Sequence, residues 1–222
     1  MNTHIHWNPK FDFVKYAQAF WLLKNISEFL TENNLSLDTT PLVSCGDFNS
    51  KANSAVYHMM MNKDYLITEK SGRAHPKTGV KAFRTTGDIR QTENYEIFKL
   101  VKEDYESNLP SLKNVLGRLD SSTSFYNQEF DLNKKYEDND DGLLEWAEDN
   151  LQRHPEYSMF QTNCHSNIDY IFFNPSTMVV KSILEIPTRE EVSKEIDIPS
   201  RLFPSDHLRM QVKFEVYFQS QQ

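Results

Sequence analysis

The chain has 222 residues and a formal net charge of −8, and 38% of its residues are hydrophobic. This length and apolar content predict one large or two small folded domains and exclude disorder over most of the chain. The acidic balance excludes a broad basic surface that binds nucleic acid through phosphates alone. No apolar run approaches the about 20 residues that span a bilayer, so no membrane partner is expected. Cys45 and Cys164 are far apart without metal-ligand spacing, which indicates reduced thiols inside the cell.

Segments of strand-like alternation are interleaved with segments of helical period, which indicates a mixed α/β sandwich. Asp12 is a candidate N-cap of the first helix, and Trp21 is one of the apolar residues at helical spacing that are expected on its core face. The alternation from Leu208 to Phe218 is the clearest strand signal. A polar and acidic stretch at about residues 70–158 is interpreted as a long insertion in a single domain, 1–222. The expected elements are extended segments at 2–7, 41–47, 167–173, 177–186 and 208–218, and helices at 12–30 and 55–62.

An apolar run that begins at Pro41 ends in the sequence Gly-Asp-Phe-Asn-Ser, residues 46–50. As strand positions two apart, Asp47 and Asn49 project to the same face, while Phe48 faces the opposite way into packing. A carboxylate beside an amide can hold a water, a phosphate oxygen or a divalent cation. The alternative is a strand followed by an Asx turn without a function.

The acidic stretch from Glu137 to Glu148 has a second interpretation as a calcium loop. Glu137, Asn139, Asp141 and Glu148 occupy positions one, three, five and twelve of an EF-hand, with a glycine at position six. Position one is normally aspartate, and the segment before the loop is a poor entering helix. A solvated acidic loop is therefore the alternative.

Four separated signals occur in order along the chain: Asn-x-His at 2–4, Gly-Asp-Phe-Asn-Ser at 46–50, Ile-Asp-Tyr at 168–170 and Ser-Asp-His at 205–207. Together they resemble the endonuclease/exonuclease/phosphatase superfamily of Mg²⁺-dependent phosphodiesterases, which are two-sheet α/β sandwiches. His-Trp-Asn-Pro followed by a Val-Lys-x-x-Gln helix resembles the deadenylase branch, which includes the carbon catabolite repression nuclease, Angel and nocturnin. The resemblance covers residues 2–55 and 161–218.

The resemblance implies a role for each matching residue. Asp47 would orient or deprotonate the attacking water, and Asn49 would contact the scissile phosphate or the metal sphere. His207 would bind the phosphate, held in one tautomer by Asp169, and His4 would be a second phosphate donor. Asp206 would lie beside the metal ion, which would be Mg²⁺ or alternatively Mn²⁺.

The resemblance also implies a substrate and a setting: the 3′ end of poly(A) in single-stranded RNA, the subunits of a deadenylase complex, and the cytoplasm or the nucleus. Pro9 matches a proline that clamps adenine in deadenylases. The clamping phenylalanine of the family is replaced by Cys164, and Phe160 is nearby but out of register. Nuclease chemistry is therefore better supported than poly(A) specificity.

The family carries a principal Mg²⁺-binding glutamate upstream of the first motif found in this chain. We therefore expect the C-terminal portion of such a domain, with weak Mg²⁺ binding, weak activity as this chain alone and some self-association. Two alternatives remain open. One is a non-catalytic or calcium-binding remnant of the same fold, and the other is a phosphoesterase that acts on another nucleotide or phosphate ester.

Overall fold

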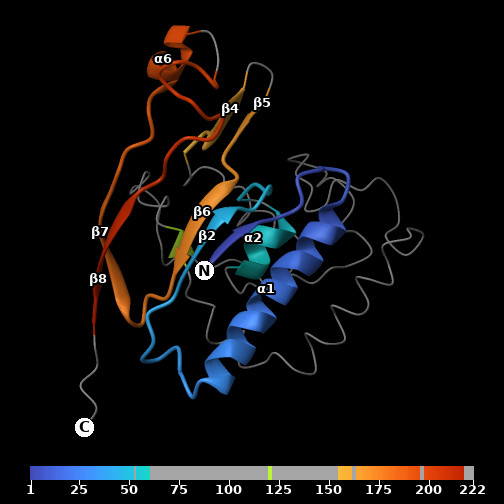
Figure 1. Ribbon diagram of the computed structural model, residues 1–222, viewed down its shortest axis with the longest axis vertical. Helices are drawn as coiled ribbons and strands as arrows, with labels where there is room; N and C mark the ends of the chain where they lie inside the picture. Colours follow the sequence, from blue (N-terminus) through green and yellow to red (C-terminus); the bar gives the residue numbers. More distant parts are fainter. Residues whose placement is uncertain (53, 61–119, 122–154, 162–163, 196–197, 218–222) are drawn as a thin grey trace, which may run out of the picture.

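The computed structural model describes residues 1–52, 54–60, 120–121, 155–161, 164–195 and 198–217 (Figure 1). Most of the expected insertion, including all four calcium-loop residues, lies outside these ranges, so the calcium interpretation stays a prediction. Residues 155–158 are described, and Tyr157 and Ser158 are buried there. In the described part of the chain, no helix is long and apolar enough to cross a membrane.

A four-stranded sheet with the order β1-β2-β6-β3 is the centre of the fold. The strands are β1 (Asn2–His4), β2 (Val43–Asp47), β6 (Asp169–Phe173) and β3 (Asp120–Ser121). β1 runs parallel to β2, whereas β2 and β3 both run antiparallel to β6. Strands from the two ends of the chain therefore lie side by side, as the expected mixed α/β architecture requires.

Helices α1 (Asp12–Glu32) and α2 (Ala55–Met60) cover one face of this sheet (Figure 1). Tyr170 and Phe172 of β6 meet Phe48 and Tyr57 in a cluster of ring contacts, with Phe48 and Phe172 centroids 5.2 Å apart. All four side chains are essentially inaccessible to solvent. Aromatic side chains bury large apolar areas, so this cluster anchors α2 on the sheet through Tyr57.

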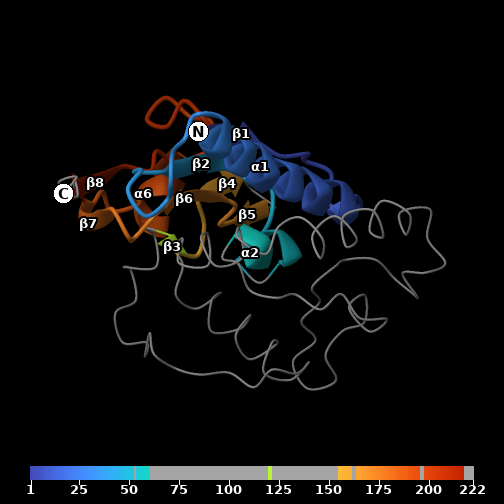
Figure 2. The same cartoon turned by 90° about the horizontal axis from the view of Figure 1, so that it is seen from below.

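A second group of short elements packs beside the sheet, as Figures 1 and 2 show. It includes the antiparallel pairs β4–β5 and β7–β8 and the helical turns α6 and η3. Its core consists of Tyr157, Phe160, Val192, Ile198 and Leu208. The bounds are β4 (Met159–Gln161), β5 (Cys164–Ser166), β7 (Met178–Ile183), α6 (Arg189–Val192), η3 (Ser193–Glu195) and β8 (Val212–Val216).

Three local predictions differ from the structure. Asp12 is the first residue of α1 rather than its N-cap, because Phe11 occupies the cap position without a side-chain cap. Trp21, expected on the core face, is 52% exposed. The last strand is β8 rather than the whole stretch from Leu208, since the Leu208 backbone N–H donates to the Ser158 carbonyl oxygen instead of a β7 ladder.

We expect Gly46→Ala to destabilise the chain. Gly46 has a φ of +144°, and a Cβ there would overlap the backbone carbonyl oxygen of Thr3 on β1. The strain and the clash should lower the free energy of unfolding by more than about 2 kcal/mol, measured by chemical denaturation. Ser44→Ala, on the same strand, is the control, with a change within about 1 kcal/mol. Unchanged stability of Gly46→Ala would contradict the close approach of the two strands.

Candidate functional site

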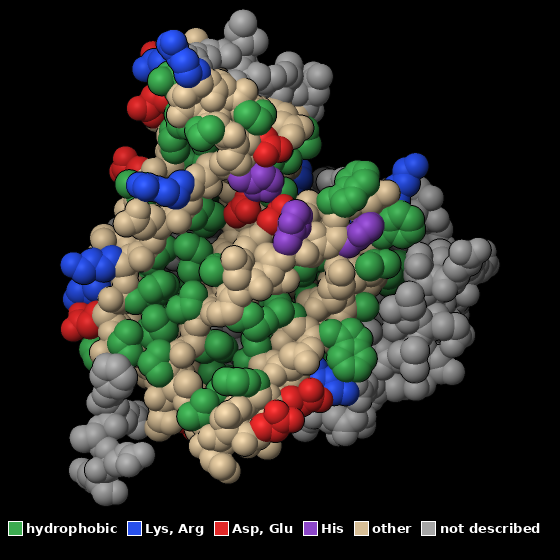
Figure 3. Space-filling model, viewed as in Figure 1, with side chains coloured by type: hydrophobic (Ala, Val, Ile, Leu, Met, Phe, Trp, Pro, Cys, Tyr) green, Lys and Arg blue, Asp and Glu red, His purple; other side chains and the backbone are tan. Residues whose placement is uncertain are grey.

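Three neighbouring strands place His4, Asp47 and Asp169 in one row across the sheet. The β1–β2 register aligns His4 with Asp47, and the β2–β6 register aligns Asp47 with Asp169. Paired residues share a face because side chains alternate along each strand. The row therefore lies on the face opposite the α1–α2 layer, and Figure 3 shows acidic and histidine side chains gathered beside hydrophobic ones on one face of the molecule.

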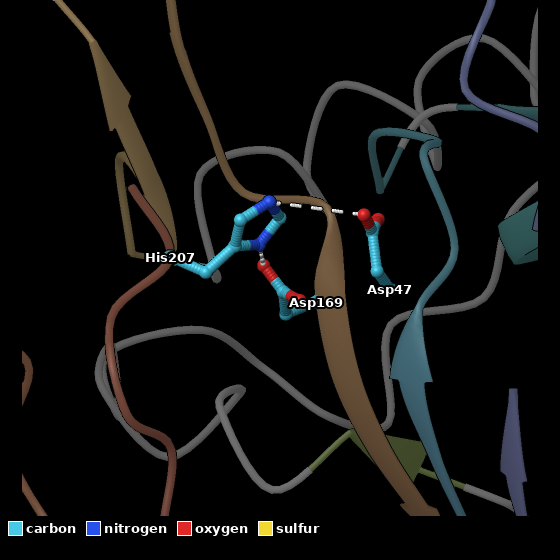
Figure 4. Close-up of side chains that lie close together, drawn as sticks. All are labelled: Asp47, Asp169 and His207. Carbon is cyan, nitrogen blue, oxygen red and sulfur yellow. Dashed lines mark hydrogen bonds and ion pairs between the residues drawn. The ribbon is translucent and has the colours of Figure 1, made fainter. Parts of the chain in front are cut away.

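His207 comes from outside the sheet and completes the row. Its Nδ1 lies 2.9 Å from Asp169 Oδ2, and its Nε2 lies 3.8 Å from Asp47 Oδ2 (Figure 4). A carboxylate can only accept a hydrogen bond, so Nδ1 carries the proton and Nε2 faces Asp47. In the described part of the chain, Asp47, Asp169 and His207 are grouped closely enough to share a metal ion.

The turn after β2 holds Asn49 against Asp47. The Asn49 backbone N–H donates to Asp47 Oδ1 at 2.7 Å, and its side-chain Nδ2 donates to Asp47 Oδ2 at 3.1 Å. Asn49 adopts a φ of +44°, and buried Lys15 donates to its carbonyl oxygen from α1. The strand therefore ends in an Asx turn, and the turn itself brings the carboxylate and the amide together. The sequence-based expectation that Asp47 and Asn49 share one face of a strand is therefore wrong, because Asn49 lies in the turn and not in the strand.

The charges of the site perturb its two central groups. Burial raises the pKa of Asp47, and the nearby Asp169 carboxylate adds to this, while the Asn49 N–H and the two histidines oppose it. The hydrogen bond to Asp169 raises the pKa of His207, so the cationic imidazolium is favoured. His4 Nε2 lies 3.4 Å from Asp47 Oδ2, and its side chain is 73% exposed. Two histidines thus flank one carboxylate, as suits the binding of an anion between them.

The donor set fits a hard divalent cation in part. Two carboxylates and an amide supply oxygen ligands of the kind that Mg²⁺ prefers, and a cation would relieve the repulsion between Asp47 and Asp169. The Asp169 oxygen nearest His207 is already engaged, because it also accepts from Ser158 Oγ at 2.7 Å. The Asp47 oxygens are engaged as well, because both accept hydrogen bonds from Asn49, whose amide nitrogen also donates to the Ile5 carbonyl oxygen.

Two predicted site residues lie outside this group. The Asp206 carboxylate accepts a 2.6 Å hydrogen bond from Gln161 Nε2. Pro9 is exposed in the turn that follows β1. Their roles at the metal and the adenine stay predictions. Lys15 belongs to the Val-Lys-x-x-Gln motif, but the sequence assigned it no role at the site. Ser158 and Gln161 were not singled out, since no motif distinguishes a lone serine or glutamine.

Comparisons with known proteins agree with this architecture, although no family model matches the chain. The chain is 29% identical over 97% of its length to the CCR4-Not complex 3′-5′-exoribonuclease subunit Ccr4 of Saccharomyces cerevisiae, and covers 20% of that protein. It is 23% identical over 94% of its length to human 2′,5′-phosphodiesterase 12, covering 24% of it. The structure of ANGEL2, a 2′,3′-cyclic phosphatase, in complex with adenosine-2′,3′-vanadate matches with a TM-score of 0.55 at 20% identity, over 96% of this chain and 55% of that one.

These likenesses define the class of the fold as the catalytic-domain fold of the endonuclease/exonuclease/phosphatase superfamily. The similarity to Ccr4 and to 2′,5′-phosphodiesterase 12 agrees with the resemblance of the motifs to the deadenylase branch. The chain spans about a quarter or less of the length of these two curated relatives and about half of the solved ANGEL2 chain.

We expect Asp169→Asn to lower the pKa of His207 toward its ordinary value. The substitution replaces the charged acceptor of the His207 hydrogen bond, which is the main cause of the raised pKa, by a neutral amide, and it also removes the attraction of the Asp169 charge. An NMR titration of the His207 ring measures the change. Asp206→Asn is the matched control, because it removes a charge beside His207 but keeps the Asp169 hydrogen bond, so a smaller shift should follow. An equal His207 pKa in wild type and Asp169→Asn would contradict the pairing.

Proposed function

We propose that this chain carries phosphate-binding and water-activating groups of a Mg²⁺-dependent 3′-5′ exoribonuclease of the deadenylase type, acting on poly(A) RNA. The row His4, Asp47, Asp169 with His207 carries the proposal. Phosphodiester hydrolysis needs a positioned water, donors for the phosphate oxygens and neutralisation of their charge. This one site contains candidate groups to position the water, to donate to the phosphate oxygens and to neutralise their charge.

Each residue has a role that follows from its contacts. Asp47 is the group that orients or deprotonates the attacking water, because its raised pKa brings a carboxylate closer to the range of a general base. His207, favoured as the cation and held by Asp169, donates from Nε2 to a phosphate oxygen. His4 is exposed on the other side of Asp47 and donates to the same phosphate. Asn49 contacts the phosphate or the metal.

Bound Mg²⁺ supplies charge neutralisation at the phosphate. Asp47 and Asn49, with Asp206 in the adjoining segment, are the residues that would hold it. Asp47 and Asp206 supply only two carboxylates, which are few for a cation that takes six ligands. We therefore infer weak Mg²⁺ binding and slow hydrolysis for this chain alone.

A second candidate function keeps the site and changes the substrate. Human 2′,5′-phosphodiesterase 12 and the 2′,3′-cyclic phosphatase ANGEL2 are both similar to this chain, and their names describe different phosphate linkages. In addition, Cys164, at the place of the adenine-clamping phenylalanine, is an exposed residue of β5. A phosphoesterase acting on another nucleotide or phosphate ester is therefore the alternative.

Hydrolysis assays test the function and the substrate together. With Mg²⁺, we expect slow cleavage of 3′-labelled oligo(A). The rate is compared with the rates for oligo(U), 2′,5′-linked oligoadenylate and 2′,3′-cyclic AMP, each assayed separately. Asp47→Asn should reduce the rate at least about 100-fold, because the water loses its base. Ser44→Ala, whose hydroxyl lies on the helix-covered face, is the control and should retain the rate.

Cleavage that survives both chelation and Asp47→Asn would contradict the proposed site. Faster cleavage of a cyclic or 2′,5′-linked substrate than of oligo(A) would replace the deadenylase assignment with the second candidate. Robust cleavage of oligo(A) at micromolar Mg²⁺ would contradict the inference of a weakly held cation.

We further propose that the chain self-associates through the sheet face that carries the site. On that face Val43, Cys45 and Ile171 are only partly buried, and hydrophobic side chains are visible there (Figure 3). Burying such surface is favourable, so the sedimentation coefficient should rise with concentration. Ile171→Lys should shift the equilibrium toward the monomer, whereas Lys213→Ala, on an exposed position of β8, should leave it unchanged. A monomer at all concentrations would contradict this proposal. We also propose, as part of the deadenylase function, that the chain binds deadenylase-complex subunits and is located in the cytoplasm or the nucleus.

A further inference from the structure

Ser158 lies just before β4 and is completely buried beside the site. Its Oγ takes part in three hydrogen bonds. The backbone N–H groups of Ile168 and Asp169 donate to it, each at 3.0 Å, and the Ser158 hydroxyl donates to Asp169 Oδ2 at 2.7 Å. A hydroxyl has two lone pairs and one proton. Because the two N–H groups use the lone pairs, the proton can only point to Asp169.

Asp169 Oδ2 therefore accepts two hydrogen bonds, one from Ser158 Oγ and one from His207 Nδ1. Two donors fix the direction of a carboxylate that a single bond would leave free to rotate. With Asp169 fixed, the His207 ring keeps its Nδ1–H on that carboxylate in both the cationic and the neutral form, and Nε2 stays toward Asp47. Ser158 thus determines the direction of His207 Nε2 indirectly, by holding the Asp169 carboxylate in place.

The backbone of Ser158 holds the other half of the pair. Its carbonyl oxygen accepts from the Leu208 N–H at 2.7 Å, and the next residue, Met159, forms a β-bridge with His207. One residue further, the Phe160 N–H donates to the Asp206 carbonyl oxygen at 2.9 Å. The segment that carries His207 is therefore attached to β4, while the side chain of Ser158 is attached to the start of β6.

We propose that Ser158 is a positioning residue for the Asp169–His207 pair, joining the two chain segments and fixing the ring proton on Nδ1. Its importance for hydrolysis rests on the proposed function, whereas its effect on the His207 ring does not. A merely structural serine would satisfy the two N–H groups of residues 168 and 169 and stabilise the turn there. The proposal differs because it requires the third bond, from the hydroxyl proton to Asp169.

The experiment compares Ser158→Ala with Ser44→Ala in the full chain. Ser44 is an equally buried serine, on β2, whose Oγ has no hydrogen-bond partner among the described residues. Ring ¹⁵N chemical shifts of His207, recorded where the ring is neutral, report the tautomer. In wild type and Ser44→Ala we expect the Nδ1–H form. In Ser158→Ala we expect a mixture of both tautomers and loss of the slowly exchanging Nδ1 proton.

Hydrolysis is the second readout. Loss of a group that orients a histidine typically costs about 10- to 100-fold in activity. We therefore expect kcat of Ser158→Ala to fall by about that factor with KM within about twofold, since the phosphate-binding atoms remain present. If wild type shows the Nδ1–H tautomer and Ser158→Ala changes it, but no protein hydrolyses any substrate, the positioning role stands and the proposed function fails.

Ser158→Cys provides a second test if Ser158→Ala does not fold, because a thiol is close in size but a weaker donor. A tautomer population between those of wild type and a fully mixed ring would support the proposal. A folded Ser158→Ala or Ser158→Cys protein with the wild-type His207 spectrum and wild-type kcat would overturn it.

Discussion

The antiparallel register between β2 and β6 is the constraint on which the site depends. It aligns Asp47 with Asp169, two like charges directly opposite each other, an arrangement that is unfavourable by itself. His207 offsets this cost by donating to one carboxylate and facing the other. A shift of β6 by one residue would turn Asp169 to the helix-covered face, away from Asp47. The aromatic cluster of Phe48, Tyr57 and Phe172 opposes such a shift, because it would lose its burial.

The site joins two separately packed parts of the described chain. Asp47 and Asp169 belong to the sheet whose other face packs on α1 and α2. His207 belongs to the segment that packs with β4 around Phe160 and Leu208. Ser158 is bonded to both parts, by its hydroxyl to Asp169 and by its carbonyl oxygen to Leu208. The relative position of Asp169 and His207 therefore depends on one buried serine as well as on the sheet.

The chain shares its fold with phosphoesterases that act on different linkages. In the proposed function the histidines and carboxylates of the described site contact a phosphate and the attacking water rather than a base, which is compatible with different linkages. Substrate choice depends on surrounding residues, and Cys164 and Pro9 are both exposed.

The sequence alone determined the mixed α/β class, the first helix, and the motifs that contain Asp47, Asp169 and His207, because periodicity and turn residues are local signals. Helix α1 is the clearest case, although its cap and the exposure of Trp21 depended on neighbours that the sequence does not name. Only the tertiary structure decided that Asp206 pairs with Gln161 and that Ser158 holds Asp169. The physical reason is that a hydrogen bond between residues far apart in the chain depends on strand register and packing, and neither leaves a local pattern in the residues that form the bond.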